Sequence, residues 1–213
     1  MPKPPSTSRA VSSGDEPSSS MVASRLATAV LDMLGSAPTS AQPSSPHPSE
    51  AVRRATAAAA AKAATAAGAL ALPPGPLGWL TVLPELLAVW RIQAQLVADI
   101  AAIYGKQGAV TREQMLYCLF KHTASQAVRD LVVRAGERWL VKTASGAALQ
   151  AVARRIGMRL SQQGVSKAAS RWLPVVGAIG VAAYAYYDTA QVARAASELF
   201  SRPIEFESEE AAG

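Results

Sequence analysis

The chain of 213 residues carries a formal net charge of +6, and half of its residues are hydrophobic. That length suits one domain with flanking segments, and the abundance of alanine, which has the highest helix propensity, predicts an all-α fold, a multi-helix bundle. A single cysteine excludes an intrachain disulfide, and two histidines offer no cluster of the three or four ligands that a zinc ion requires.

Proline and serine dominate most of residues 1–49, a composition that cannot bury enough apolar surface to become ordered. We therefore expect a disordered leader with one short helix near 21–35, where apolar residues recur at helical spacing. Arg25 and Asp32 interrupt that apolar run, which argues against a signal peptide and favours a helix that docks on the main domain or on a partner. The sequence leaves open whether translation begins at Met21 instead of the first residue.

The main helical domain is expected over residues 50–201, followed by an acidic flexible tail at 202–213. Three prolines end its first helix, and the second is expected to begin at Pro84, because proline is tolerated in a first turn. Thr111 and Gln114 fit a capping box at the start of the third. Hydrophobic periodicity predicts helices over residues 51–72, 84–105, 112–120, 123–142, 145–163 and from 174 onward.

Basic residues are concentrated in the main domain, where residues 51–201 contain 17 Lys and Arg against 7 Asp and Glu. The predicted helix at 145–163 has an apolar face and, opposite to it, a basic face, as membrane-surface helices do. Such a charge favours anionic partners, either phospholipid or nucleic acid. The candidate contacts with an anionic membrane are Arg154, Arg155, Arg159, Lys167 and Arg171. The alternative for the arginines is a helix face that is simply exposed to water.

A run of 16 uncharged residues, from Trp172 to Tyr187, includes the first half of the last predicted helix. This run is shorter than the roughly 20 residues that cross a bilayer. Three interpretations remain open: a core helix of a bundle, half of an inserted helical hairpin paired with residues 51–90, or a single span. In the first, the Gly- and Ala-rich first half is deeply buried and the second half, after Asp188, is half-exposed.

No motif for an enzyme, a cofactor or a metal is present: there is no phosphate-binding glycine loop, no nucleophile elbow and no metal-ligand spacing. Cys118 and His122 would share a helix face, but a buried cysteine near a surface histidine is the more common arrangement. Asp99 lies on a mostly apolar helix, where we expect it to pair with an arginine or to cap a neighbouring helix rather than to act in catalysis.

Two segments carry a resemblance to a known family. WRIQAQLVADIAAIYG resembles the DIA-x-x-YG signature of EcsC-family proteins, and RWLPVVGAIG is similar to the start of that family's closing helix. YcjF-like inner-membrane domains have related patterns. The resemblance implies an α-helical, membrane-associated bacterial protein and brings no catalytic residues with it. The residues that carry it are Asp99, Ile100, Ala101, Tyr104, Gly105, Pro174 and Gly177.

We therefore expect a non-enzymatic protein on the cytoplasmic side of a bacterial inner membrane, an accessory or scaffold in a transport or envelope process. Its partner would be an anionic membrane surface or an inner-membrane protein. The alternative is a membrane-active effector or pore-former that inserts an apolar helical hairpin, and a cytoplasmic location is the alternative to the membrane. A nucleic-acid partner is disfavoured, because no stacking aromatics accompany the basic residues, and no small-molecule substrate is evident.

Overall fold

The computed structural model describes residues 19–36, 38–70, 78–106, 108, 110–168 and 174–207. Within these ranges the chain is mostly helical, with one small sheet, which confirms the predicted fold class. The helices are α1 Ser19–Gly35, α2 Pro48–Leu70, α3 Gly78–Ile103, α4 Arg112–Phe120, α5 Ser125–Val128, α6 Gly146–Ala168 and α7 Pro174–Phe200. The strands are β1 Val132–Ala135, β2 Arg138–Lys142 and β3 Ile204–Glu207.

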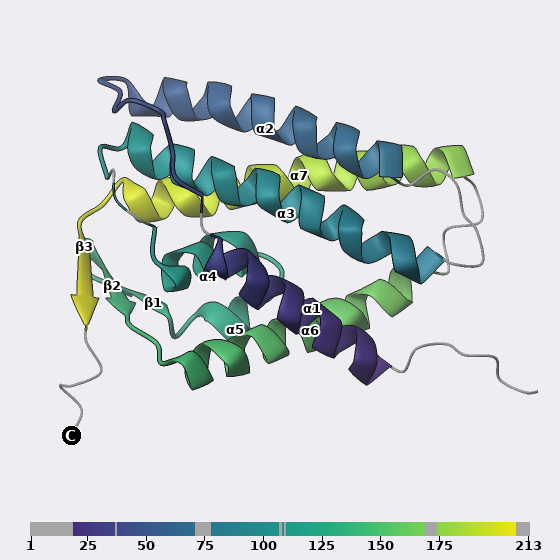
Figure 1. The fold of residues 1–213 in the computed structure, drawn as a ribbon. Helices are drawn as coiled ribbons and strands as arrows, with labels where there is room; N and C mark the ends of the chain where they lie inside the picture. Colours follow the sequence, from purple (N-terminus) through teal and green to yellow (C-terminus); the bar gives the residue numbers. More distant parts are fainter. Residues whose placement is uncertain are drawn as a thin grey trace, which may run out of the picture.

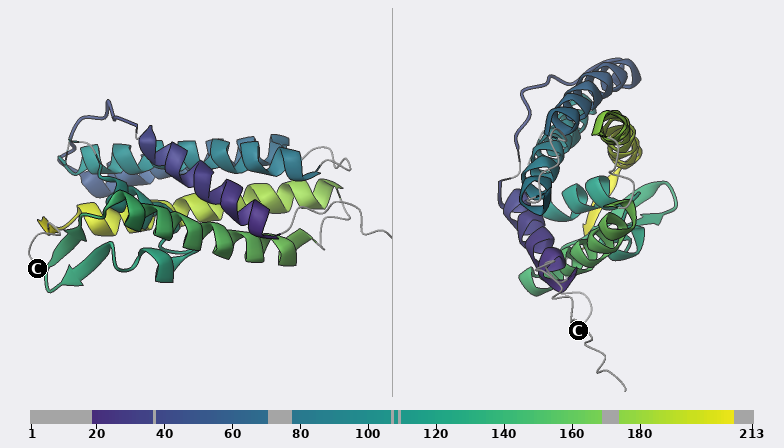
Figure 2. Two further views of the ribbon diagram at one scale, coloured as in Figure 1. Left: turned by 60° about the horizontal axis from the view of Figure 1, so that its bottom comes forward. Right: turned by 90° about the vertical axis from the view of Figure 1, so that its right-hand side faces the viewer.

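Three long helices, α2, α3 and α7, pack against one another along the length of the molecule (Figure 1). Helices α1 and α6 form a second pair beside them, and Figure 2 shows that the sheet and α4 lie toward the end where α7 finishes. The main core lies at this end. Its most deeply buried side chains include Ile100 of α3, Phe120 of α4 and Leu199 of α7.

The short helix α4 is buried along almost its whole length. The predicted capping box begins it, since the Thr111 hydroxyl accepts from the Gln114 backbone N–H and the Gln114 side chain accepts from the Thr111 N–H. Phe120 meets Trp90 of α3 edge to face, with 5.4 Å between ring centroids. This contact joins α4 to the middle of α3.

The predicted helix over 123–142 is wrong apart from the single turn of α5. Strands β1 and β2 form an antiparallel hairpin, in which Ala135 pairs with Arg138 across a two-residue turn. Gly136 in that turn has a φ of +61°, a conformation that L residues with side chains rarely adopt. Residues 204–207, expected to belong to a flexible tail, form β3 and pair in parallel with β2; residues 208–213 lie outside the described residues.

Helix α3 begins at Gly78, six residues before the predicted start at Pro84. Pro84 therefore lies inside the helix, where it supplies no backbone N–H for the helical hydrogen-bond ladder. Pro84 itself is exposed. Helix α3 is consequently longer at its N-terminal end than predicted.

Burial along α7 is the reverse of the expected order. Ile179 is 66% exposed and Tyr187 is 60% exposed in the first half, whereas Val192 and Leu199 in the second half are completely buried. The second half packs among α3, α4 and the main core, while the first half has α2 and α3 as its neighbours. Composition alone could not reveal this, because both halves are rich in alanine.

Candidate functional site

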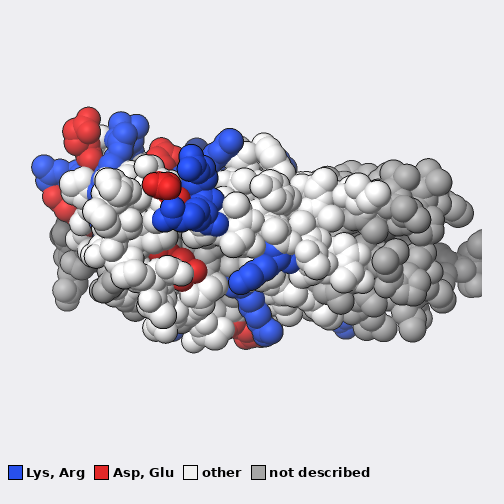
Figure 3. Space-filling model, turned by 90° about the horizontal axis from the view of Figure 1, so that it is seen from above, with Lys and Arg blue, Asp and Glu red and all other residues white. Residues whose placement is uncertain are grey.

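Charged residues are almost absent from one end of the three long helices. Beyond Lys62 in α2 and before Asp188 in α7 these helices contain no charged residue, and before Arg91 the only charge in α3 is Glu85. On the face shown in Figure 3, the charged side chains gather toward the end where α2 begins, leaving uncharged surface beyond them. We call residues 63–70, 78–90 and 174–187 of these helices the apolar end.

Contacts between side chains show which residues of α2, α3 and α7 lie at the same level in the apolar end. Gln93 of α3 donates from Nε2 to Oδ2 of Asp188 over 2.7 Å, and one turn earlier Val89 lies in a small buried cluster with Ala185. Ala63 and Ala67 of α2 complete that cluster. Small side chains allow the helix backbones to approach closely, so α7 packs on both helices of the α2–α3 pair.

Aromatic side chains lie on the surface of the apolar end beside the first charge. Tyr184, Tyr186 and Tyr187 are between 46% and 60% exposed, and Ile179 lies two turns before them. Burial raises the pKa of the Tyr184 hydroxyl, and the neighbouring Asp188 carboxylate raises it further. Tyrosine is enriched at the level where a membrane meets water, because the ring is apolar and the hydroxyl is polar.

The apolar end is shorter than the hydrocarbon core of a bilayer is thick. Helix α7 rises about 20 Å between Pro174 and Asp188, at 1.5 Å per residue, whereas a bilayer has a hydrocarbon core of about 30 Å. One stretch of the described helices, Leu86–Ile103 of α3, is apolar enough to cross a membrane, but 61% of it is buried inside the protein. It belongs largely to the main core, not to the apolar end.

A polar junction lies between α3, α7 and the turn after α4, beside the apolar end. His122 lies 2.6 Å from Oδ1 of Asp188, while Gln93 also donates to the Thr189 hydroxyl, which itself donates to a backbone carbonyl of α7. The His122 and Asp188 side chains are only 19% and 13% exposed. This network satisfies the polar groups where α3, α7 and the turn after α4 meet.

The possible cysteine–histidine pair does not form, since His122 takes Asp188 as its partner. Cys118 is completely buried, and burial raises the pKa of its thiol, so the thiolate needed for nucleophilic attack or metal binding is disfavoured. Among the described residues, no group of three His, Cys, Asp or Glu side chains could hold a metal ion.

The two-faced helix α6 uses its apolar face inside the protein. Val152 and Ile156 are buried, and α6 packs chiefly on α1. The two backbones touch at Gly157, where an added Cβ would lie 2.3 Å from the carbonyl oxygen of Ala23. Of the predicted membrane contacts, Arg154, Arg155 and Arg159 are exposed on α6, whereas the Lys167 side chain and Arg171 lie outside the described residues.

Asp99, the first residue of the EcsC-like motif, holds a linker rather than an arginine or a helix cap. Its Oδ1 accepts from the Ser40 hydroxyl over 2.6 Å and from Gln95 Nε2 over 3.0 Å, while Gln95 also donates to the Thr39 carbonyl. These bonds fix the segment between α1 and α2 on the surface of α3. The role of Asp99 in this structure is therefore to position the linker.

The remaining motif residues build the end of α3. Ile100 and Ala101 are buried in the main core, and Tyr104 is half-buried at its edge. Gly105 has a φ of +74°, and the Gly105 and Lys106 N–H groups donate to the Ala102 and Ala101 carbonyls, which makes a Schellman cap. Pro174 and Gly177 lie in the first turn of α7, and their surroundings are outside the described residues.

Replacing Gly105 by alanine is expected to lower the free energy of unfolding by about 1 kcal/mol, because a Cβ is disfavoured at positive φ. Its nearest neighbour, Cβ of Ser44, is 3.9 Å away, so backbone strain rather than a clash would cause the loss. Urea unfolding followed by circular dichroism measures it. Gly105→Asn, which tolerates this conformation better, should lose less, and an equal loss in both variants would contradict the assignment.

The EcsC protein family model matches residues 48–202, which include α2 to α7. The chain belongs to the EcsC family. No curated protein and no solved structure matches it. Helix α1 lies before the matched region, although it packs on α6 within that region.

Proposed function

We propose that this protein is a monotopic membrane-associated protein, which enters one leaflet with its apolar end and keeps its main core in water. The observation that supports this most directly is the exposure of Ile179, Tyr186 and Tyr187 in the part of α7 that precedes its first charged residue, Asp188. In water this surface is costly, since burying an isoleucine side chain contributes about 1.5–3 kcal/mol. A membrane would remove that cost.

The charges at the boundary support the same orientation. Lys62 and Arg91 are exposed at the level where the tyrosines end, and each would contribute about 1 kcal/mol beside anionic headgroups. The α6 arginines provide a second, lateral basic surface for the same membrane. Attachment would thus combine apolar insertion with charge, the two signals that stable anchoring generally needs.

The proposed role is that of a non-enzymatic accessory or scaffold in a transport or envelope process, on the cytoplasmic face of the inner membrane. Support for this role comes from the pairing of His122 and Gln93 with Asp188 in the polar junction and from the burial of the cysteine, which leave these groups unsuited to act on a substrate. What remains available is surface, with the apolar end for lipid and the charged end for an inner-membrane protein.

Fractionation of cells that make the full chain tests the attachment. Membranes are washed with concentrated salt and then with alkaline carbonate, and the chain is followed by immunoblotting. We expect retention through the salt wash, because insertion of the apolar end does not depend on screened charges. Release by salt alone would indicate attachment through the α6 basic face, and a chain found only in the cytosol would overturn the proposal.

Vesicle leakage separates this function from that of a pore-former. An apolar end about 20 Å long is shorter than the hydrocarbon core of about 30 Å, so it would enter the bilayer without crossing it. Vesicles filled with a quenched dye should therefore bind the protein and remain sealed. Leakage at low ratios of protein to lipid would favour the insertable-hairpin alternative.

A further inference from the structure

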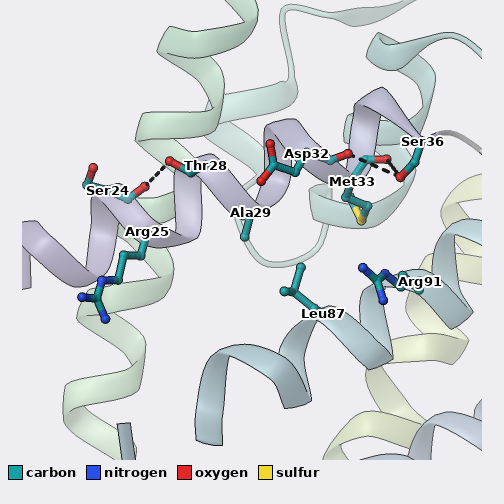
Figure 4. A pocket seen from close by; sticks show the side chains of 9 residues that line it. All are labelled: Ser24, Arg25, Thr28, Ala29, Asp32, Met33, Ser36, Leu87 and Arg91. Carbon is teal, nitrogen blue, oxygen red and sulfur yellow. Dashed lines mark hydrogen bonds between the residues drawn. The ribbon is translucent and has the colours of Figure 1, made fainter. Parts of the chain in front are cut away.

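Helix α1 has one main neighbour in the structure, the helix α6. The two helices pack closely against each other, whereas α1 has far fewer contacts with α3. A groove of about 360 Å³ lies between α1 and α3, and Leu87 and Arg91 form its α3 side (Figure 4). The docking of α1 therefore depends chiefly on α6.

The contact between α1 and α6 is held by apolar side chains. Leu26 and Val30 of α1 and Ile156 of α6 are buried in one cluster. The charged residues of α1, Arg25 and Asp32, take part in none of the ion pairs among the described residues. Burial of apolar surface has no preferred direction, so another apolar environment can replace α1 on α6.

The face of α6 that α1 covers is bordered by positive charge. Helix α6 contains no acidic residue. Arg155 follows Val152 by three positions and Arg159 follows Ile156 by three, so each exposed arginine lies about 60° around the helix from a buried apolar residue. Long arginine side chains at such a border reach headgroups while the apolar face enters the acyl region. An anionic lipid surface therefore fits both features of this face.

The covered face and its cover differ in their relation to the family. The EcsC match over residues 48–202 includes α6, whereas α1 lies before it. The covered face thus belongs to the family domain, and α1 is a separate element whose docking removes that face from the surface of the domain.

We propose that α1 is a displaceable cover over a second membrane-binding surface, the apolar face of α6 with Arg155 and Arg159 at its border. In water α1 occupies this face, and at an anionic bilayer the acyl region takes its place. This inference rests on the proposed membrane attachment, to which it adds a second contact and a means of controlling it.

Limited trypsin digestion of the full chain tests the displacement. Phosphatidylglycerol vesicles should speed cleavage after Arg25 in α1 about tenfold, because a released helix unfolds locally, and should slow cleavage after Arg159 in α6. Phosphatidylcholine vesicles, which lack the anionic headgroup, should change both rates less than about twofold. Unchanged cleavage after Arg25 in the presence of phosphatidylglycerol would overturn the inference.

A buried charge in α1 tests the same competition without a change in α6. Val30→Asp should release α1 and tighten binding of the full chain to phosphatidylglycerol vesicles about tenfold in co-sedimentation. The matched control is Ser24→Asp, which puts the same charge on an exposed position of α1 and should leave binding unchanged. Adding Arg155→Gln and Arg159→Gln to Val30→Asp should remove the gain, whereas the same two changes in the wild-type chain should cost less than about threefold.

A peptide of residues 19–36 distinguishes release of α1 from unfolding of the core. In excess, it should occupy α6 of the Val30→Asp variant and reverse the gain, and the same peptide carrying Val30→Asp should not. A gain that the peptide leaves unchanged would come from an exposed core and would overturn the inference. So would a Val30→Asp variant that forms dimers and binds vesicles no better, because the face would then take a second copy of the chain. Equal binding by Ile179→Asp and the wild-type chain would count against the apolar end alone, so the two proposals fail separately.

Discussion

Ile179→Asp should weaken binding to vesicles about 100-fold while leaving the free energy of unfolding unchanged. The side chain is 66% exposed, so the protein itself does not need its apolar character. Placing a charge in the hydrocarbon core costs about 2.5–3.5 kcal/mol on insertion scales, and each 1.4 kcal/mol is a factor of ten. Co-sedimentation with vesicles and urea unfolding measure the two quantities.

Two exposed apolar residues elsewhere provide matched controls. Phe206 on β3 is 59% exposed and Met158 on α6 is 50% exposed. Phe206→Asp lies far from the apolar end and should leave vesicle binding unchanged. A large loss in Met158→Asp together with no loss in Ile179→Asp would mean that α6, and not the apolar end, enters the membrane.

Gly157→Leu is expected to destabilise the protein by about 3 kcal/mol and to detach α1 from α6. Even a Cβ at this position would lie 2.3 Å from the Ala23 carbonyl oxygen and 3.2 Å from the Ala27 nitrogen, both of them backbone atoms that no rotamer change can move. Overpacking of this kind costs about 1–3 kcal/mol or more. Leu26 and Val30 would lose part of their burial as α1 moves away.

Urea unfolding measures the decrease in the free energy of unfolding, and limited trypsin digestion shows which helices become accessible. Cleavage after Arg25 in α1 and after Arg159 in α6 should become faster than cleavage in α2. Gly180→Leu is the matched control, since a Cβ there has nothing within 4 Å and a leucine in a helix interior stabilises by about 0.5–1 kcal/mol relative to glycine. Equal destabilisation of both variants would contradict the close approach of α1 and α6.

Several helices were predictable because hydrophobic spacing and local chemistry agree in them. In α4 the capping box and the apolar run after it both indicate a helix, and both are present. The helix near 21–35 was predictable for the same reason, and it corresponds to α1. What the sequence could not show is its docking site, because nothing local in α1 specifies Gly157 as the point of contact.

The β-hairpin carried a signal that helix propensity obscured. Val132 and Val133 are β-branched, and Gly136 follows them at the place of a two-residue turn. That pattern is typical of a hairpin. The alanine-rich composition of the chain favoured a helix over 123–142, but the turn at Gly136 and the β-branched residues before it produce a hairpin at 132–142.

The site was only partly predictable. The absence of charges between Trp172 and Asp188 is visible in the sequence, and so is the cluster of tyrosines beside Asp188, on which the proposed membrane attachment rests. A groove between α1 and α3 (Figure 4) was not predictable, because its lining residues Arg25 and Arg91 are 66 positions apart in the sequence and line one groove only because α1 lies across α3. The exposure of the first half of α7 was also not predictable, because it depends on which other helices pack against that half in the folded protein.

The hydrogen bond between Asp99 and Ser40 also limits how far α1 can move from α6 if the two helices separate. Only the four residues 36–39 separate the end of α1 from Ser40, a tether of about 14 Å at full extension. While Asp99 holds that hydroxyl, a detached α1 stays near α6 at a local concentration in the millimolar range or above. Release and return of α1 would therefore be a unimolecular equilibrium, independent of protein concentration. A helix from another molecule could replace α1 on α6 only if its affinity exceeded the advantage that the tether gives to α1.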